Sequence, residues 1–467
     1  MSSPQHLGNQ LRHLLKVSAS CRSTVQYTTC RNKSLSAFAN LPITESVRQR
    51  VKTSLLDEAI RDDSRLWKGG KYIEGVDDEI SQLHDPLDDL YTEASTRYWP
   101  KLPSSVLSAA DPFALTQLEL DKLSKSIRED LLGTDHPVLS KAASYFFKAT
   151  SDGGKKVRPM MVLLLSRALS DSFHSADPKN LNGTGLSSIS SSSSLFTTPL
   201  DWQRSDLPQA QRRLAEISEM IHTASLFHDD VIDGAETRRG APSVHMVFGN
   251  KMAILAGDYL LARASICLAR LRNVEVVETM STIIEHLVRG EVMQLRGSTS
   301  SERSGERLVY YLRKNFYKTG SLMANSCKSA ALLGEYPNEL VDASYRFGKH
   351  VGMAFQLVDD VLDFEGSLSS LGKPALADLT AGLATAPVLF AAEECCDLEP
   401  LIDRKFRNTG DIERAVEYVF QSSGIERTKE LARVHAESAM DAILELDSSL
   451  HRDSLVHLAN KVVARTK

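Results

Sequence analysis

The sequence predicts an all-α protein, and two features of the chain carry that prediction. Apolar residues recur with the 3.6-residue period of a helix through long runs, and the alternation typical of strands is scarce from about Asp111 onward. The four clearest runs are Gln209–Phe227, Lys251–Leu271, Leu340–Phe364 and Asp411–Phe420. With 467 residues, 42% of them hydrophobic, the chain is also long enough to bury a large core.

Composition and charge exclude several classes of protein. Lys and Arg number 55 against 60 Asp and Glu, so the chain has no basic footprint and we do not expect it to bind nucleic acid. The longest uninterrupted apolar run, Met160–Leu165, is far shorter than the ~18 residues of a membrane span. Six cysteines form no CxxC pair, which favours a reducing compartment and argues against structural zinc.

The N-terminal region differs from the rest of the chain. Residues 1–44 contain Arg12, Lys16 and three further basic residues but no Asp or Glu, and they are rich in Ser and Thr. This composition predicts a mitochondrial transit peptide, with a plain disordered tail as the alternative. Residues 45–110 are mixed and loop-rich, and we interpret them as a partly ordered extension without visible chemistry.

A helical domain is predicted over residues 111–467. It opens with an apolar face that includes Leu115 and Leu123, which Gly133 and Pro137 then interrupt. Residues 170–206 contain the stretch SSISSSSSLFTT, and such Ser-rich composition predicts a disordered surface insertion between two helices.

Two similar clusters of carboxylates dominate the chemistry of the sequence. The first is the sequence DDVID at 229–233, and the second is DDVLD at 359–363, 130 residues later. On a helix, the first and last aspartate of each cluster lie one turn apart on the same face. The candidate metal ligands are Asp229, Asp230, Asp233, Asp359, Asp360 and Asp363.

The surroundings of these clusters favour a metal site over a solvated acidic face. Apolar residues precede and interrupt both clusters, in TASLFHDDVIDG and GMAFQLVDDVLDFEG. Two like charges ~4 Å apart repel by about 4 kcal/mol at an effective dielectric near 20, so converging carboxylates need cations. Mg²⁺ bridging to phosphate is the natural solution, because it is a hard ion that prefers oxygen ligands.

Cations suited to phosphate stand near both clusters. The sequence GGKKVRP at 153–159 places flexible glycines and basic residues before an apolar helix, although it is not a Walker loop. Arg238 and Arg239 follow the first cluster, where paired guanidiniums can bind diphosphate oxygens.

Together with YKTGSLMA and LGKPALADL, these motifs closely resemble those of the trans-isoprenyl diphosphate synthases. The resemblance runs from about Asp111 to the C-terminus. It implies an isoprenoid-synthase-type bundle of long helices around a central cavity, with the two motifs facing each other across it. The basic N-terminus and the Ser-rich insertion resemble the fungal-type mitochondrial members that make the ubiquinone side chain.

The resemblance also implies a role for each site residue. All six aspartates would hold Mg²⁺ on an allylic diphosphate and act catalytically with Lys318. The residues expected to contact the allylic substrate are Arg238, Lys318, Thr319, Gln356 and Lys373. The residues expected to bind isopentenyl diphosphate are Lys155, Arg158, His222 and Arg239. Without the resemblance, a hydrogen-bonded core histidine would be the default interpretation of His222.

The implied reaction is a prenyl transfer that needs no protein nucleophile. Metal ions stabilise the departing diphosphate, the double bond of isopentenyl diphosphate attacks the allylic carbon, and a proton is lost. Repetition would give a long-chain all-trans polyprenyl diphosphate. By the same resemblance, we expect a homodimer on the matrix side of the mitochondrion, in peripheral contact with the inner membrane.

Two positions depart from the short-chain members of the family. Where many of them carry a second lysine after the second motif, this chain has Leu383, so the allylic site would lose one cation although Lys373 remains. Ala224 and Ser225, five and four residues before the first aspartate, replace the aromatic floor of short-chain members. Small side chains there predict a long product, with deeper residues such as Ile221 as candidates for the final stop.

Three rival functions fit the sequence less well. A class I terpene cyclase would need an acidic residue where Leu333 ends the possible triad of Asn325 and Ser329. A di-iron oxidase would need a second ExxH besides the one at 219–222, and we find no persuasive partner. A regulatory subunit of a heteromeric synthase would typically have lost the aspartates, which are intact here.

Overall fold

A computed structural model describes the chain over 111–128, 141–142, 145, 156–175, 207–238, 241–297, 304–369 and 376–465. All of these residues belong to one compact unit, Tyr91–Lys467. The predicted transit peptide (1–44) and extension (45–110) lie outside the described residues.

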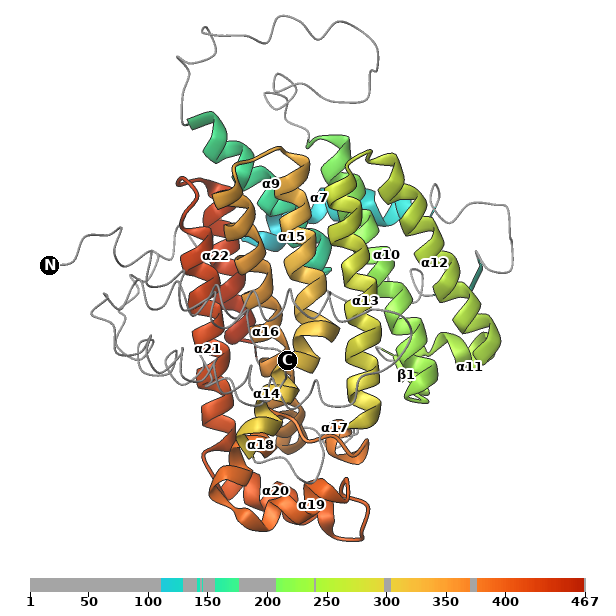
Figure 1. Ribbon diagram of the computed structural model, residues 1–467, viewed down its shortest axis with the longest axis vertical. Coiled ribbons are helices and arrows are strands. Elements are labelled where there is room, and N and C mark those ends of the chain that lie inside the picture. Colours follow the sequence, from blue (N-terminus) through green and yellow to red (C-terminus); the bar gives the residue numbers. More distant parts are fainter. Residues whose placement is uncertain are drawn as a thin grey trace, which may run out of the picture. The chain divides into compact units, whose positions relative to one another are not determined.

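The described residues confirm the all-α prediction (Figure 1). The first helices are α7 (Pro112–Ser126), α9 (Val157–Ser175), α10 (Gln209–Ile232), α11 (Val244–Phe248), α12 (Asn250–Arg270) and α13 (Val274–Arg296). They are followed by α14 (Ser304–Asn315), the π-helix η5 (Phe316–Gly320), α15 (Ser321–Leu333) and α16 (Asn338–Ser369). The C-terminal set is α17 (Ala377–Thr380), α18 (Ala386–Glu394), η6 (Cys396–Leu398), α19 (Glu399–Asp403), α20 (Asp411–Gln421), α21 (Gly424–Ile443) and α22 (Leu450–Val463).

A short antiparallel ladder interrupts the helices directly after the first aspartate cluster. Strands β1 (Thr237–Arg238) and β2 (Ala241–Pro242) pair with Thr237 opposite Pro242 and Arg238 opposite Ala241. The ladder turns the chain from the end of α10 into α11.

Several helices begin where the sequence supplies a cap. The Asp111 carboxylate accepts a hydrogen bond from the Ala114 N–H at 3.1 Å, and Pro112 follows at the first helical position. The side chain of Asn273 caps α13 in the same way, at 3.0 Å from the Val276 nitrogen.

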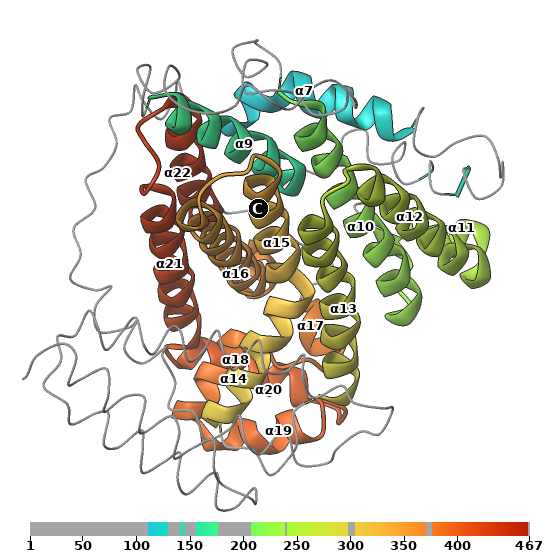
Figure 2. The ribbon, with the colours of Figure 1, turned by 45° about the horizontal axis from the view of Figure 1, so that its top comes forward.

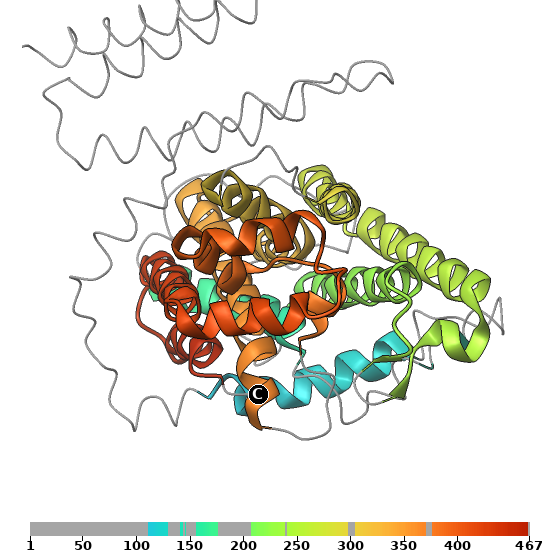
Figure 3. The same cartoon turned by 90° about the horizontal axis from the view of Figure 1, so that it is seen from below.

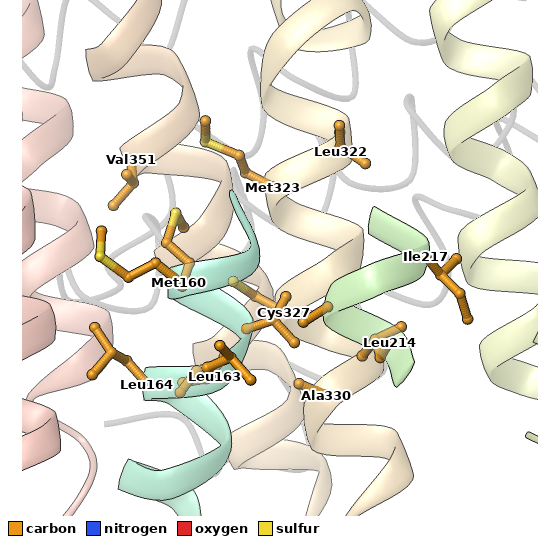
Figure 4. Close-up of a cluster of buried hydrophobic side chains, with 14 of the residues drawn as sticks. Met160, Leu163, Leu164, Leu214, Ile217, Leu322, Met323, Cys327, Ala330 and Val351 are labelled. Atoms are coloured by element: carbon orange, nitrogen blue, oxygen red, sulfur yellow. The ribbon is translucent and has the colours of Figure 1, made fainter. Parts of the chain in front are cut away.

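Apolar side chains of α9, α10, α15 and α16 form one part of the core (Figure 4), and α12, α13, α21 and α22 add further buried side chains to it. Met160, Leu164, Leu214 and Cys327 are all fully buried there. Helix α10 packs against α9, α12 and α15, while α16 packs against α15 and α21. Figures 1 and 2 show these long helices running side by side. The shorter C-terminal helices α18 to α20 lie across one end, in front when the molecule is seen from below (Figure 3).

Glycines bring α16 unusually close to α15 and η5. A Cβ added to Gly352 would lie 2.8 Å from the Cα of Gly320, and one added to Gly348 would lie 2.5 Å from the Met323 oxygen. Only glycine fits such a backbone approach. This contact fixes the second aspartate cluster, two turns further along α16, beside the π-helix.

The predicted start of the Ser-rich insertion is wrong by several residues. Residues 170–175, which we assigned to the insertion 170–206, instead form the last part of α9. Contacts with the C-terminal region hold this end in a helix, because Asp171 pairs with His451 at 2.7 Å and the Ser172 hydroxyl accepts from the Asp447 N–H at 2.9 Å. Residues 176–206 lie outside the described part of the chain.

Exposed apolar side chains cluster on α12 and α13. By length and composition alone, helix α12 is apolar enough to cross a membrane. In its most apolar 18-residue stretch, 39% is buried against the rest of the protein. Its exposed members include Leu255 and Ile266, and those of α13 include Val288 and Leu295.

Candidate active site

The two aspartate motifs occupy different parts of their helices. Asp229 and Asp230 lie in the last turn of α10, and Asp233 ends that helix, with its N–H donating to the Asp229 carbonyl at 2.8 Å. The second motif lies inside α16, which continues to Ser369. Both placements confirm the predicted one-turn spacing between the outer aspartates.

Asp378, on α17, is repelled by aspartates of both motifs. Burial raises the pKa of Asp378, and repulsion from Asp363, Asp359 and Asp233 raises it further. Because the first two belong to the second motif and Asp233 to the first, carboxylates from both motifs lie within electrostatic reach of one side chain. The structure therefore brings the two predicted clusters to one region.

The outer aspartates carry negative charge that the protein only partly compensates. Burial raises the pKa of Asp229 to about 6, with Lys318 opposing the rise and Glu291 adding to it. Burial likewise raises the pKa values of Asp233 and Asp359. Carboxylates with raised pKa values are suited to bind a cation, because a bound cation stabilises their ionised form.

The middle aspartate of each motif is buried and held by protein donors. Asp230 is 1% exposed and accepts from the Arg238 Nε at 2.6 Å. Asp360, also 1% exposed, accepts from the Tyr311 hydroxyl and from the Gln356 amide at 3.0 Å. These oxygens are largely occupied, so the middle aspartates orient the site more than they offer free ligands.

The π-helix η5 presents the predicted pair Lys318 and Thr319. The Lys318 ammonium pairs with Glu291 of α13 at 2.5 Å, and the Thr319 hydroxyl donates to the Gln356 side-chain oxygen at 3.0 Å. Gly290 makes room for this lysine, because a Cβ added there would lie 2.7 Å from the Lys318 Cγ. Single π-helical turns are frequent at functional sites, since they re-aim side chains out of the helical register.

Two of the predicted isopentenyl diphosphate ligands meet directly. The Arg158 Nη1 lies 2.9 Å from the His222 Nε2, which joins the first turn of α9 to α10. Arg158 also opposes the rise that burial causes in the pKa of Asp359, so its charge reaches the second motif. His222 is buried, as a core histidine would be, but its ring faces a cation of the candidate site. The predicted ligands Lys155, Arg239 and Lys373 lie outside the described residues.

The predicted chain-length positions lie directly behind the first motif. Ala224 is fully buried, and the half-buried Ser225 donates its hydroxyl hydrogen to the His222 carbonyl at 2.9 Å. Ile221, one turn deeper on α10, is also fully buried. The side chains behind Asp229 are therefore small at two successive positions and become larger beyond them.

Sequence reasoning missed several residues that the fold adds to this site. Tyr311, Glu291 and Asp378 belong to no pattern that we had linked to the aspartates. Asp378 stood within the quoted motif LGKPALADL, and its position shortly after the second cluster was the one available signal.

Arg465, near the C-terminus, also reaches the second motif. Its Nη2 donates to the Asp359 Oδ1 at 2.5 Å and to the Phe355 carbonyl at 3.3 Å, and its guanidinium lies 4.1 Å from the centre of the Phe355 ring. Arg465 and Asp359 are 106 positions apart in the sequence, so no local sequence pattern predicted this contact.

The donors fit Mg²⁺ held together with a phosphate ligand. Within the described ranges, no three His, Cys, Asp or Glu side chains form a ready-made metal cage. Mg²⁺ usually takes one or two carboxylates and completes its shell with phosphate oxygens and water. The two aspartate motifs supply oxygen ligands in two groups, with lysine and arginine side chains nearby. This suits Mg²⁺ bound together with a phosphate better than it suits a structural metal site.

Comparisons with known proteins point to one family. Residues 136–419 match the family model described as polyprenyl synthetase. The chain is 48% identical over 377 residues to a probable mitochondrial hexaprenyl pyrophosphate synthase of Neurospora crassa, covering 77% of this chain and 83% of that protein. It is 40% identical over 390 residues to an all trans-polyprenyl-diphosphate synthase of Homo sapiens, covering 83% and 82%.

A solved structure extends the similarity to the fold. A polyprenyl synthase from Caulobacter crescentus, crystallised with calcium and isoprenyl diphosphate, matches with a TM-score of 0.62 and 26% identity. The match covers 77% of this chain and 98% of that one.

Proposed function

The chain belongs to the polyprenyl synthetase family, and from this premise we propose that it elongates an allylic diphosphate with isopentenyl diphosphate units to a long-chain all-trans polyprenyl diphosphate. It is thus a prenyltransferase, and its product supplies the side chain of ubiquinone. The observation that carries the proposal is the electrostatic meeting of both aspartate motifs at Asp378. A solvated acidic surface would not bury the middle aspartates, Asp230 and Asp360, as this site does.

Family chemistry requires a divalent metal, and we propose Mg²⁺ held by the outer aspartates of both motifs. When bound, Mg²⁺ neutralises charge on the departing diphosphate and so favours cleavage of the C–O bond. The proposed direct ligands are Asp229, Asp233, Asp359 and Asp363. Asp230 and Asp360 would hold these ligands in place through their own buried hydrogen bonds.

The cations divide between the two substrates. Lys318 and Arg238 would bind the allylic diphosphate together with Thr319, Gln356 and Lys373. Arg158 and His222 would bind isopentenyl diphosphate, with Lys155 and Arg239 as further ligands. Their direct contact supports a shared role, because a guanidinium can stay beside a neutral imidazole and still offer its other donors to phosphate.

Ala224 and Ser225 would let the growing chain pass. Their small size behind the metal site supports a long product, since a large side chain there would block the path. We expect Ala224→Phe to shorten the product by several isoprene units. Sizing of the products by chromatography tests this, and an unchanged product would contradict the proposed path.

The exposed apolar face of α12 and α13 supports a homodimer. Exposed valine, leucine and isoleucine side chains on two adjacent helices are the composition of an interface between copies of one chain. Light scattering of the purified protein tests the dimer. Leu255→Glu on α12 should convert it to a monomer without changing the fold.

The mitochondrial relatives support a mitochondrial location. We place the protein on the matrix side, in peripheral contact with the inner membrane, since a long polyprenyl tail is lipophilic. Fractionation of mitochondria with a protease-protection step would test both placements.

One assay tests the function itself. The purified protein is incubated with Mg²⁺, labelled isopentenyl diphosphate and either farnesyl or geranylgeranyl diphosphate. We expect label in long hydrophobic products and none after chelation of the metal. Products formed without isopentenyl diphosphate would instead indicate a terpene cyclase, and no products at all would contradict the proposal.

A further inference from the structure

Lys314 is a buried cation for which the site described above has no use. It lies in the last turn of α14, one residue before Asn315 begins the passage into the π-helix, and only 9% of it is exposed. Among the residues that the structure describes, no hydrogen bond or ion pair holds its ammonium. The ammonium lies over the ring of Tyr311, whose centre is 5.4 Å from Nζ.

A buried ammonium without such a partner is costly, because water has been removed and nothing equivalent replaces it. Side chains of this kind usually pair with a carboxylate at hydrogen-bond distance. Carboxylates in the surrounding structure attract the Lys314 ammonium, but none of the described ones forms a hydrogen bond or ion pair with it. An oxygen atom of a bound ligand would supply the missing hydrogen-bond acceptor.

The charges around Lys314 are those of the candidate active site. The Lys314 ammonium is attracted by Asp360 of the second motif and by Asp378, and it is repelled by Lys318. Lys314 and Lys318 stand four positions apart on one continuous helical segment. Lys314 and Lys318 thus both lie within electrostatic reach of the candidate site's carboxylates, as ligands of a bound anion would.

The sequence gives this lysine a specific meaning. Position 383 holds leucine where many short-chain members of the family carry a second lysine after the second motif. The Leu383 N–H donates to the main-chain carbonyl of Asp378 at 2.9 Å, so the turn after α17 ties position 383 to the backbone of Asp378. The carboxylate of that same residue attracts Lys314.

We propose that Lys314 binds the diphosphate of the allylic substrate and supplies the cation that Leu383 does not. The proposal rests on the proposed function for the identity of the substrate. The binding of a magnesium diphosphate to this lysine, however, can be measured without any turnover. In this chain the positive charge would therefore come from the end of α14, where many short-chain members of the family supply it from the loop after α17.

The first experiment measures binding of inorganic diphosphate in the presence of Mg²⁺ by calorimetry. Lys314→Met should weaken binding by about tenfold to a hundredfold, the usual range for losing one charge-assisted contact. Lys314→Arg should retain most of the affinity. In the double variant Lys314→Met/Leu383→Lys, a lysine at position 383 supplies the positive charge instead. Its affinity for diphosphate should exceed that of Lys314→Met by at least about tenfold.

The same variants are then compared in the elongation assay. Lys314→Met should raise KM for the allylic diphosphate or lower kcat, leaving KM for isopentenyl diphosphate near the wild-type value. Lys122→Met, which removes an exposed lysine from α7, serves as the control for loss of a charge elsewhere. Thermal unfolding of each variant separates ligand binding from damage to the fold.

Each outcome decides the proposal. It is overturned if Lys314→Met binds magnesium diphosphate as tightly as the wild type, if arginine fails as completely as methionine, or if Leu383→Lys restores nothing. A fall in Tm that accounts for the lost affinity would assign Lys314 a purely structural role. If the wild type binds diphosphate through Lys314 but does not elongate, the proposed function fails while this inference stands.

Discussion

The two aspartate motifs have almost the same sequence, DDVID and DDVLD, yet they are supported in different ways. Asp230 of the first motif is held by Arg238, eight residues further along the chain. Asp360 of the second is held by Tyr311, 49 residues away, and Asp359 by Arg465, 106 residues away. The hydrogen bond that holds the middle aspartate of the first motif is therefore local, whereas the contacts of the second motif depend on the packing of distant helices.

The position within the helix explains part of this difference. The first motif ends α10, where the helix dipole is negative and additional carboxylates are unfavourable. It therefore depends on nearby cations, including Lys318 and, when bound, a metal. The second motif lies inside α16 and accepts backbone N–H groups from α17, since Ala377 donates to Asp363 at 3.1 Å. The comparison teaches that hydrogen-bond support can be local in one motif and distant in its near-copy, while the charge balance of both depends on the tertiary fold.

The largest expected effects come from the outer aspartates, and they test whether both motifs serve equally. Asp229→Asn and Asp359→Asn should each lower kcat/KM by about 10²–10³, the usual loss when one group stabilising a developing charge is removed. The elongation assay measures this, with Asp121→Asn on α7 as the control. If either variant remains fully active, its motif does not hold the metal and the two are not equivalent.

Removing the distant support of the second motif should have the next largest effect. Tyr311→Phe deletes the hydroxyl that donates to Asp360, and we expect Mg²⁺ affinity to fall by about 10-fold to 100-fold. Tyr310→Phe is a matched control, because the neighbouring hydroxyl donates to the Met293 carbonyl instead. Magnesium titration of activity measures both. Equal affinities for the two variants would show that Asp360 needs no support from α14.

The pH dependence of stability should also differ between the motifs. Burial raises the pKa of Asp360 to about 7 and that of Asp229 to about 6, both above the value of about 4 in an unfolded chain. The folded, metal-free protein therefore binds more protons than the unfolded one. Its free energy of unfolding falls as pH rises through these values, by up to about 1.4 kcal/mol per pH unit for each group.

Between pH 6.5 and 8 the fall in stability should come chiefly from Asp360 and the neighbouring Asp378, and less from the first motif. The buried pair His350 and His435, whose pKa values burial lowers, still titrates in the unfolded chain near pH 6.5, but this contribution is the same in the wild type and in both variants and cancels when their slopes are compared. In chelator, denaturant unfolding should lose the downward contribution to the slope in Asp360→Asn and keep it in Asp229→Asn. The reverse result would assign the higher pKa to the first motif.

The smallest effect is expected from the C-terminal arginine. Arg465→Met removes one cation from Asp359, which stays partly exposed, so we expect kcat/KM to fall by no more than about fivefold. Arg452→Met on α22 is the control, because Arg452 pairs with its neighbour Asp453 and, within the described part of the chain, makes no hydrogen bond or ion pair with the motif. A much larger loss would show that the C-terminus is a required part of the second motif.

Periodicity and local chemistry let the sequence alone determine much of this protein. The long apolar runs predicted α10, α12, α16 and α20, because a helix repeats its buried face within a few residues. The spacing of the aspartates predicted that Asp229 lies one turn from Asp233 and Asp359 one turn from Asp363. The family resemblance carried by the motifs also assigned Arg158 and His222 to one substrate, and the structure places these two side chains in contact.

Only the tertiary structure decided which groups complete the site. The six aspartates look alike in sequence, but burial separates the middle ones from the outer ones. Tyr311, Asp378, Lys314 and Arg465 join the second motif because glycines draw α16 against the π-helix and because α17 and the C-terminus fold back onto it. The end of α9 became helical for the same reason, through contacts with α22. Contacts between positions so far apart follow from the packing of whole helices, and no short stretch of sequence records them.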